Sequence, residues 1–406
     1  MSQVPSQHEP SASRNIYAFG ITSFLNDTAT EMAYWVLPAF LVSLGAGPAQ
    51  LGLIEGIAES VASFAKLISG YLTDRLKRRK PVVVGGYFVA NAVKPLLAVA
   101  TTWWHVLLIR FTDRLAKGVR GAPRDVMVAE AVGKNQLGAA YGFIQSLDSA
   151  GAIVGPLAAW FLLRHTGVRS VFWAAAVPGA LCVLVAWFGI RETKRPHFSQ
   201  ETREMGHTYP SESADAVPAT SSKELPGTFY FVLLAVTLFS LGNSSDMFLV
   251  MRAQNVGIPV ALAPLLGLVF NLTYTLGSWP AGWFSDHFSR RWIAGAGYLI
   301  FAAVYFVFGR AHSAISIWVS MAVYGVYYAL TQPVLKALVV ESVAQEIRGR
   351  ALGIYFFVTS IATLAASLIT GELWKHYGAG TAFYFSAALA AVSASCLMLS
   401  NSGSDG

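Results

Sequence analysis

The feature that most limits how this chain can fold is a series of apolar segments, each long enough to cross a bilayer as a helix. A crossing needs about 20 mainly apolar residues, and such segments recur along nearly the whole chain. We place them at about 16–45, 49–73, 81–101, 103–130, 136–164, 170–190, 229–255, 261–284, 291–310, 313–342, 346–374 and 380–400. Only 13% of the residues are charged, against about 25% in a soluble domain. The sequence therefore predicts an all-α polytopic membrane protein of twelve transmembrane helices.

The net charge of +7 is explained by membrane topology rather than by nucleic-acid binding. Most lysines and arginines lie in short connections between apolar segments, as in cytoplasmic loops. The even-numbered connections carry Arg75, Lys77, Arg78, Arg79, Lys80, Arg124, Lys134, Arg290, Arg291, Arg348 and Arg350. The odd-numbered ones offer Arg164, Arg169, Arg252, Arg310 and Lys375. We expect a multi-pass protein of the cytoplasmic (inner) membrane, surrounded by lipid, with both termini in the cytoplasm.

A polar segment rich in proline and serine divides the chain into two halves. Residues 191–228 show no periodicity, which is typical of a flexible linker, and a plain tether is favoured over a regulatory element. We expect a cytoplasmic tail (1–15), a six-helix bundle (16–190), the linker (191–228), a second bundle (229–400) and a tail (401–406). The first fifteen residues lack the basic and apolar regions of a cleaved signal.

The two halves repeat one another weakly, at an offset of about 212 residues. GYLTDRLKRR (70–79) matches GWFSDHFSRR (282–291), EMAYWVLP from Glu31 matches DMFLVMRA from Asp246, and Glu130 aligns with Glu341. Three matches at nearly one offset indicate an internal duplication. Parallel six-helix repeats are typical of one transporter architecture.

These motifs make the chain resemble the major facilitator superfamily of transporters over nearly its whole length. GYLTDRLKRR is similar to the superfamily loop Gly-x-x-x-Asp-Arg-x-Gly-Arg-Arg, with Lys77 in place of the second glycine. Arg110 stands where proton-coupled members carry a membrane-embedded arginine. The resemblance implies two six-helix bundles and transport by alternating access.

Two further elements carry this resemblance. Gly142, Gly151, Gly155 and Pro156 resemble the glycine-proline motif of antiporters, although Ala158 and Ala159 replace usual glycines. The second half lacks the motif, as in family exporters, so export is favoured over uptake. A cytoplasmic gating loop is expected from Gly70, Asp74, Arg75, Arg78, Arg79, Asp286 and Arg290. In it we expect Asp74 to pair in one state and release in the other, whereas Arg78, Arg79 and Lys80 more simply anchor the topology.

The stretch RFTDRLAKGVRGAPRD (110–125) is the most unusual part of the apolar frame. On a helix its charged residues fall within an arc of about 140°. They are Arg110, Asp113, Arg114, Lys117, Arg120, Arg124 and Asp125. A charge facing hydrocarbon near mid-helix costs about 2.5–3.5 kcal/mol. We therefore expect this face to line a water-filled cavity, and its lower part, from Arg120, to reach the cytoplasmic surface.

Carboxylates on neighbouring segments are the candidate partners of these cations. Ionisable groups inside a membrane are functional candidates by default, with an interhelical ion pair as the alternative, for example at Asp113. The candidate coupling and cavity residues are Asp27, Glu31, Glu55, Glu59, Lys66, Arg110, Asp113, Arg114, Lys117, Asp148 and Asp246.

We expect Asp27, Glu31 or Glu59 to exchange a proton beside Arg110 or Arg114. Protonation would free the arginine to engage substrate, and deprotonation would restore the ion pair. Proton and substrate would then compete for one set of groups, which is antiport.

Other classes of function find less support. Cys182 and Cys396 lie in apolar segments without metal-ligand spacing, the eight histidines are scattered, and no catalytic set stands out. We expect no enzyme activity, cofactor or metal, and a monomer that carries a small organic, anionic or amphipathic molecule together with protons. Proton-coupled uptake of a small organic anion and a transporter-like sensor remain alternatives.

Overall fold

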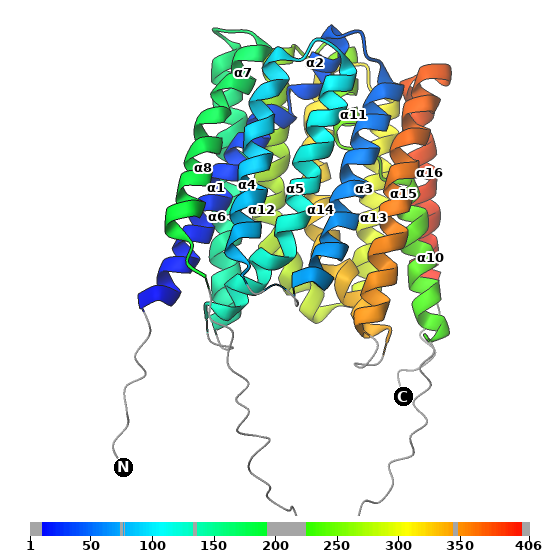
Figure 1. Ribbon diagram of the computed structural model, residues 1–406. Helices are drawn as coiled ribbons and strands as arrows, with labels where there is room; N and C mark the ends of the chain where they lie inside the picture. The colour runs from blue at the N-terminus through cyan, green and yellow to red at the C-terminus, as the bar shows by residue number, and fades with distance from the viewer. Residues whose placement is uncertain are drawn as a thin grey trace, which may run out of the picture.

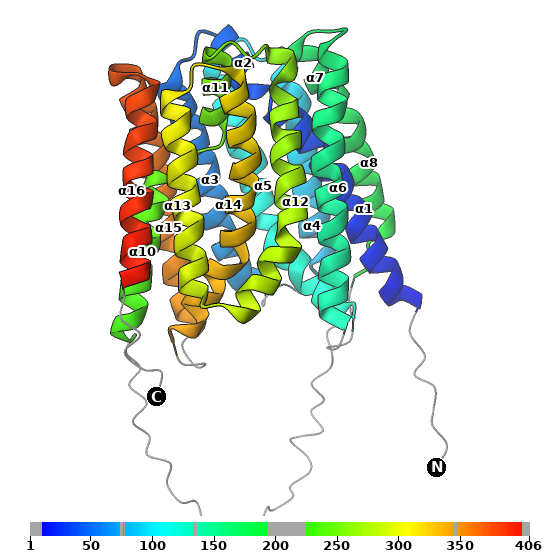
Figure 2. The same cartoon turned by 180° about the vertical axis from the view of Figure 1, so that it is seen from behind.

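The computed structural model describes residues 10–73, 76, 78–132, 136–192, 225–343 and 348–399, and these form an all-α bundle of helices that run up and down side by side (Figures 1 and 2). The described helices form twelve rods, arranged as two six-helix bundles, as the sequence predicts. The first helix begins and the last one ends at the same end of the bundle. We call this the terminal end and the opposite one the far end.

The first six rods belong to the first half of the chain. Three of them consist of two consecutive helices each, and the other three are single helices. In chain order they are α1 (Pro10–Tyr34) with α2 (Leu37–Ser43), α3 (Pro48–Thr73), α4 (Lys80–Val93) with η1 (Lys94–Val99), α5 (Trp103–Glu130), α6 (Leu137–Leu163) and α7 (Val168–Ala174) with α8 (Ala176–Gly189). The bounds of α5 are those expected from the sequence.

The other six rods follow the linker. They are α10 (Gly227–Gly242) with α11 (Met247–Asn255), η3 (Val260–Leu262) with α12 (Ala263–His287), α13 (Arg290–Arg310), α14 (Ala314–Glu341), α15 (Arg348–Tyr377) and α16 (Ala379–Leu399). The continuous helix expected over 229–255 was wrong at its centre, because residues 243–246 are not helical. Asparagine, serine and aspartate compete with helical hydrogen bonds through their own side chains, and four of them follow Gly242 here.

Two interruptions in the first half coincide with prolines. Pro38 lies at the start of α2, after the break at Trp35 and Val36, and Pro95 lies in the tighter η1 turn that follows α4. Proline lacks an N–H group and collides with the preceding turn. The break after α4 brings Lys94 to a helix junction inside the bundle, where its side chain is buried.

Nine segments of the described chain are long and apolar enough to cross a membrane. The three rods outside that set are α1 with α2, α3 and α5. Each of these carries several ionisable residues along its length, for example Glu55, Glu59 and Lys66 on α3. The candidate site lies among these three rods and α6.

The halves meet along two long helix pairs and one short contact. Helix α3 packs along α15, α6 packs against α12, and α2 contacts α11 at the far end. The Ser60 hydroxyl donates to the Ser360 carbonyl at 3.0 Å, and Phe64 meets Phe357 edge to face. Gly52 and Gly371 lie where the α3 and α15 backbones approach most closely, because an added Cβ at either would collide with the other helix.

An ion pair recurs at the terminal end of both halves. Arg79 at the start of α4 pairs with Glu130, the last residue of α5, and Arg290 at the start of α13 pairs with Glu341, the last residue of α14. These pairs occupy matching places in the repeat and support the duplication. Arg79 is buried, so it does more than anchor topology.

Candidate functional site

The charged face of α5 lies inside the bundle. Arg110, Asp113 and Arg114 are each about 5–6% exposed, whereas Phe111 and Leu115 are 37% and 38% exposed on the outer surface. Because the two sets alternate at helical spacing, one helix presents apolar side chains to lipid and charged ones to its neighbours. Arg120, which we expected at the cytoplasmic surface, is also buried. That expectation was wrong, since α4 covers this turn of α5.

Three ion pairs join α5 to α3 at successive levels. The Arg110 guanidinium grips both oxygens of Glu55, with Nη2 donating at 2.6 and 2.8 Å and Nε at 2.8 Å. Toward the terminal end, Arg114 Nη2 lies 3.2 Å from Glu59 Oε1, and Lys66 Nζ lies 3.9 Å from Asp125 Oδ2.

Helix α3 provides one charged side chain to each of the three ion pairs. This side chain is more exposed in the pairs that lie closer to the terminal end. The Glu55 side chain is 0% exposed, that of Glu59 is 43% exposed and that of Lys66 is 60% exposed. This gradient means that water reaches the pairs from the terminal end and stops before Glu55. The polar interior is therefore open at one end of the bundle.

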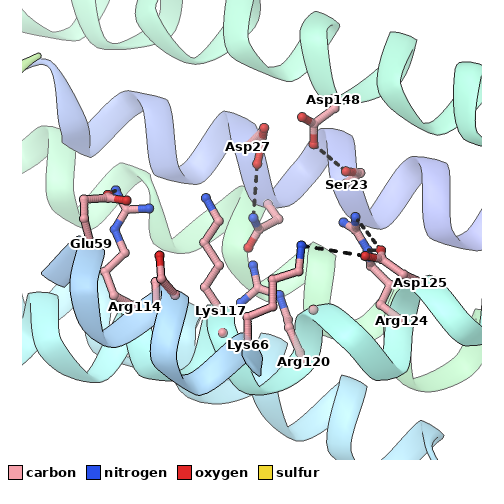
Figure 3. Close-up of a pocket in the computed structure, with 15 residues that line it drawn as sticks. Ser23, Asp27, Glu59, Lys66, Arg114, Lys117, Arg120, Arg124, Asp125 and Asp148 are labelled. Carbon is pink, nitrogen blue, oxygen red and sulfur yellow. Dashed lines mark hydrogen bonds and ion pairs between the residues drawn. The ribbon is translucent and has the colours of Figure 1, made fainter. Parts of the chain in front are cut away.

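A cavity of about 280 Å³ occupies this open part (Figure 3). Helices α1, α3, α5 and α6 provide its walls, and their polar lining residues are Ser23, Asn26, Asp27, Glu59, Ser63, Lys66, Arg114, Lys117, Arg120, Arg124, Asp125 and Asp148. A volume near the lower end of the usual 300–1,000 Å³ of ligand pockets suits a small molecule.

Two carboxyl groups, from α1 and α6, lie beside one another at the wall of this cavity. Asp27 and Asp148 lie close enough to interact electrostatically, and their carboxyl groups are seen side by side in Figure 3. The Ser23 hydroxyl donates to Asp148 at 2.6 Å, and the Asn26 amide donates to Asp27 at 3.2 Å. No basic side chain of the described residues forms an ion pair with either carboxyl group.

The glycines of α6 explain why these carboxyl groups are neighbours. A Cβ at Gly151 would lie 2.5 Å from the Phe24 carbonyl oxygen, and one at Gly155 would lie 2.7 Å from that of Thr28. Only glycine lets α6 approach α1 this closely. Gly142, by contrast, has nothing within 4 Å of an added Cβ, and Pro156 is accommodated inside α6.

Beyond the cavity, toward the far end, buried groups connect the two halves. The Ser245 hydroxyl, in the non-helical segment before α11, donates to Glu55 Oε2 at 3.4 Å. Trp35 donates from Nε1 to Glu31 at 2.6 Å and packs against Gly267 of α12. Within the second half, Asp246 accepts hydrogen bonds from Tyr324 at 2.6 Å and Tyr328 at 3.2 Å. The contacts of Ser245 with Glu55 and of Trp35 with α12 close the bundle above the cavity.

Sequence reasoning missed Lys94, a buried partner of α5. Its Nζ lies 3.7 Å from Asp113 Oδ1 and 3.2 Å from Asn91 Oδ1, to which it donates. Asp113 is also 3.9 Å from Arg110. A lysine before a proline inside an apolar segment was the available signal, because such a residue needs a partner in the interior.

The structure joins only some of the predicted pairs. Arg110 binds Glu55 rather than Asp27, Glu31 or Glu59, and Arg114 binds Glu59 as one of the expected combinations. Of the predicted gating loop, Asp74, Arg75 and the side chain of Asp286 lie outside the described residues. Gly70 lies beside α5, Arg78 is exposed, and Arg79 and Arg290 pair with glutamates.

Comparison with known proteins agrees with this geometry. The Major Facilitator Superfamily profile matches residues 19–251 and 228–404. The chain belongs to the major facilitator superfamily. An uncharacterised transporter of this superfamily from Methanocaldococcus jannaschii is 32% identical over 385 residues, covering 92% of both chains. The multidrug resistance protein MdtG of Escherichia coli is 30% identical over 198 residues, covering 47% of this chain and 48% of that protein.

Solved structures show the same fold at low identity. A bacterial homologue of the lysosomal transporter Spinster, in an inward-facing and occupied conformation, has a TM-score of 0.72 at 15% identity, covering 96% of this chain and 97% of that one. A POT family transporter in complex with 5-aminolevulinic acid has a TM-score of 0.75 at 13% identity, covering 95% and 96%. The chain is thus a multi-pass membrane transporter of this superfamily.

Proposed function

We propose that this transporter moves a small organic molecule across the cytoplasmic membrane in exchange for protons, by alternating access. The observation that carries the proposal is the cavity among α1, α3, α5 and α6. It is open at the terminal end, closed toward the far end and lined by ionisable groups. A site that is accessible from one side at a time is what alternating access requires. With both termini in the cytoplasm, the conformation is the inward-facing one.

The Glu59–Arg114 pair and the Asp27–Asp148 pair are the places where we propose that protons bind. Both lie on the cavity wall, where protons can reach them through water. Protonating Glu59 would release Arg114, whose Nε has no hydrogen-bond partner among the described residues. Glu31 is the third candidate proton site. Its protonation would change the hydrogen bond from Trp35, which packs against α12.

Export is the direction that we propose first. It is supported by the similarity to MdtG, a multidrug resistance protein, and by the close packing of α6 on α1 through Gly151 and Gly155. In an exporter of this kind, the solute enters from the cytoplasm and competes with protons for the same carboxylates. Deprotonation then favours loading, and protonation from the far side favours release.

Proton-coupled uptake of a small organic anion is the second candidate, and the sign of the cavity charges favours it. Neutralising a carboxylate beside a cation strengthens the attraction of that cation for an anionic solute. Proton and anion would then bind together, which gives symport. Exchange for protons instead requires a solute that binds the ionised carboxylates themselves.

Proton-driven flux in vesicles tests the proposal. A metabolite comparison between cells with and without the gene supplies solutes, and inside-out vesicles with an acidic interior are then expected to accumulate an exported one. Three single variants, Asp27→Asn, Glu31→Gln and Glu59→Gln, then identify the coupling carboxylate. Its replacement is the one after which accumulation no longer follows the pH gradient.

The control is Glu372→Gln, which changes an exposed carboxylate on the last turns of α15 and should leave flux unchanged. Coupling that is unchanged in all three cavity variants would contradict the proposed proton sites. Binding of a solute without any flux would indicate a sensor.

A further inference from the structure

Two of the cations on the cavity wall form no ion pair with an acidic side chain of the described part of the chain. Lys66 and Arg124 both lie near Asp125, and Arg114 pairs with Glu59. Lys117 and Arg120 form no ion pair with any described residue. They are three residues apart on α5, so their side chains lie on the same face of the helix, and both line the cavity (Figure 3).

Arg120 is the more unusual of the two because it is buried. Its side chain is 6% exposed, and its Nη1 has no hydrogen-bond partner among the described residues. The nearby carboxylate of Asp113 is already within 4.0 Å of Lys94 and Arg110. Burying a charge without a partner is costly. The protein nevertheless keeps the Arg120 charge buried, at the wall of the cavity.

A shaped slot holds the Arg120 side chain in place. Its guanidinium carbon lies 4.3 Å from the centre of the Tyr87 ring on α4. Gly86, the preceding residue, leaves the space that the side chain occupies, since an added Cβ would lie 2.6 Å from Arg120 Cβ. Such cation–π contact orients a guanidinium without neutralising its charge. The group is thus fixed and still electrostatically available.

The charges around the cavity leave a positive excess. Its lining includes five cations and four acids, and two of the acids, Asp27 and Asp148, face each other. Lys117 also interacts electrostatically with Asp27 on α1, with Glu59 on α3, and with Arg114 and Arg120 on its own helix.

We propose that Lys117 and Arg120 form an oxyanion subsite, which binds a carboxylate or phosphate group of the transported solute. The inference rests on proton-coupled transport in its uptake form, the second candidate above, and assigns residues to the anionic group of the solute. An oxyanion between the two side chains supplies the partner that the described residues do not provide, through charge-assisted hydrogen bonds. A lipophilic cation would instead face two unpaired positive charges. The cavity volume of about 280 Å³ suits a small solute.

Binding of the oxyanion is linked to protonation of the Asp27–Asp148 pair. A proton bound to this pair weakens the electrostatic attraction between the pair and Lys117. The lysine is then available to bind the solute. By thermodynamic reciprocity, the bound oxyanion makes the pair easier to protonate. Oxyanion affinity therefore rises as the pH falls, which is the behaviour of the symport candidate.

The test measures binding of simple oxyanions to the full chain in phosphatidylcholine nanodiscs. Acetate, citrate and inorganic phosphate are titrated against chloride at constant ionic strength, and the melting temperature is followed by tryptophan fluorescence. At least one oxyanion should raise it in a saturable way. Lys117→Gln and Arg120→Gln should each weaken that affinity by about tenfold or more, as loss of a charge-assisted hydrogen bond predicts.

Two matched variants separate binding from structure. Arg164 stacks on Trp160 at 4.6 Å much as Arg120 stacks on Tyr87, but it is exposed and outside the cavity lining. Arg164→Gln should bind oxyanions like the wild type. Arg120→Lys should restore part of the affinity. Because Lys117 is exposed, Lys117→Gln tests the proposal even if Arg120→Gln does not fold.

The proton linkage is tested with Asp27→Asn and Asp148→Asn, which imitate the protonated pair. In both variants oxyanion affinity should be high and should vary less with pH than in the wild type. No saturable effect of any oxyanion, or wild-type affinity in Lys117→Gln and Arg120→Gln, would overturn the subsite. An effect of phosphatidylglycerol in the nanodisc without any effect of soluble oxyanions would assign these cations to lipid and equally overturn it.

Failure of this inference differs from failure of the proposed function. Proton-coupled flux of a neutral or cationic solute without oxyanion binding would leave transport standing and remove the subsite. Oxyanion binding without flux of any solute would do the reverse.

Discussion

At the scale of single residues, the interior of this protein contains both satisfied and unsatisfied charges. Arg110 and Glu55 form a bidentate pair that is almost completely buried. Lys117 and Arg120, about two and three turns further along the same helix, have no acid partner among the described residues. A satisfied pair favours structure, whereas an unsatisfied one leaves binding capacity, so we propose different roles for the two parts of α5.

Arg110→Leu should destabilise the protein strongly, because Glu55 would stay buried without its cation. Loss of one partner from a buried pair costs about 3–5 kcal/mol of unfolding free energy. Denaturation in detergent measures the change, and the double variant Arg110→Leu/Glu55→Leu should recover part of it. Lys375→Gln disrupts an exposed pair with Glu372 and should cost no more than about 1 kcal/mol. Equal losses in the two single variants would argue against a structural role for the Arg110–Glu55 pair.

At the scale of helices, close contact between α1 and α6 determines how the carboxyl groups meet. The contact depends on Gly151 and Gly155, which face the α1 backbone. Sequence similarity associates this motif with antiport, and the structure adds a physical reason for its glycines. They bring Asp148 beside Asp27, so helix packing and the candidate proton site are one arrangement.

Gly155→Ala should push α1 and α6 apart and lower both stability and coupled flux. The added methyl group would lie 2.7 Å from the Thr28 carbonyl oxygen and 2.8 Å from Glu31 Cβ, and overpacking of this kind costs about 1–3 kcal/mol. Gly142→Ala is the matched control. It meets nothing within 4 Å and should stabilise α6 by about 0.5–1 kcal/mol. Thermal denaturation and flux of both variants decide the matter, and the same behaviour in both would refute the packing argument.

At the scale of the whole molecule, the two ends of the bundle differ. Exposure of the α3 side chains increases toward the terminal end, while α2 and α11 meet at the far end. Together with the expected cytoplasmic termini, this difference predicts which side of the membrane has access to the cavity.

Accessibility labelling tests this prediction. In a variant without Cys182 and Cys396, a cysteine in place of Lys66 should react with a membrane-impermeant thiol reagent in inside-out vesicles and be protected in right-side-out vesicles. Ser313, exposed at the far end, provides the control, since Ser313→Cys should show the opposite pattern. Labelling of Lys66→Cys from outside only would reverse the proposed orientation.

The order of elements was predictable from the sequence because apolar length and helical periodicity are local properties. The bounds of α5 and its inward charged face followed directly from such patterns. The break at residues 243–246 was missed because long apolar segments on both sides hide a short polar run. Burial of Arg120 was missed as well, since only the position of α4 and its Gly86 and Tyr87 determine it.

The sequence alone determined that this chain crosses a membrane with twelve helices and carries its charges on the inner faces of a few of them. Helical periodicity indicates which residues share a face. Because a charge in hydrocarbon is costly, the charged face points to the interior of the bundle. Only the tertiary structure decided which ionisable groups lie together. Arg110 meets Glu55, Asp113 meets Lys94, and Asp27 meets Asp148. Partners on different helices depend on distances of a few ångströms, which helix packing sets and no local pattern records.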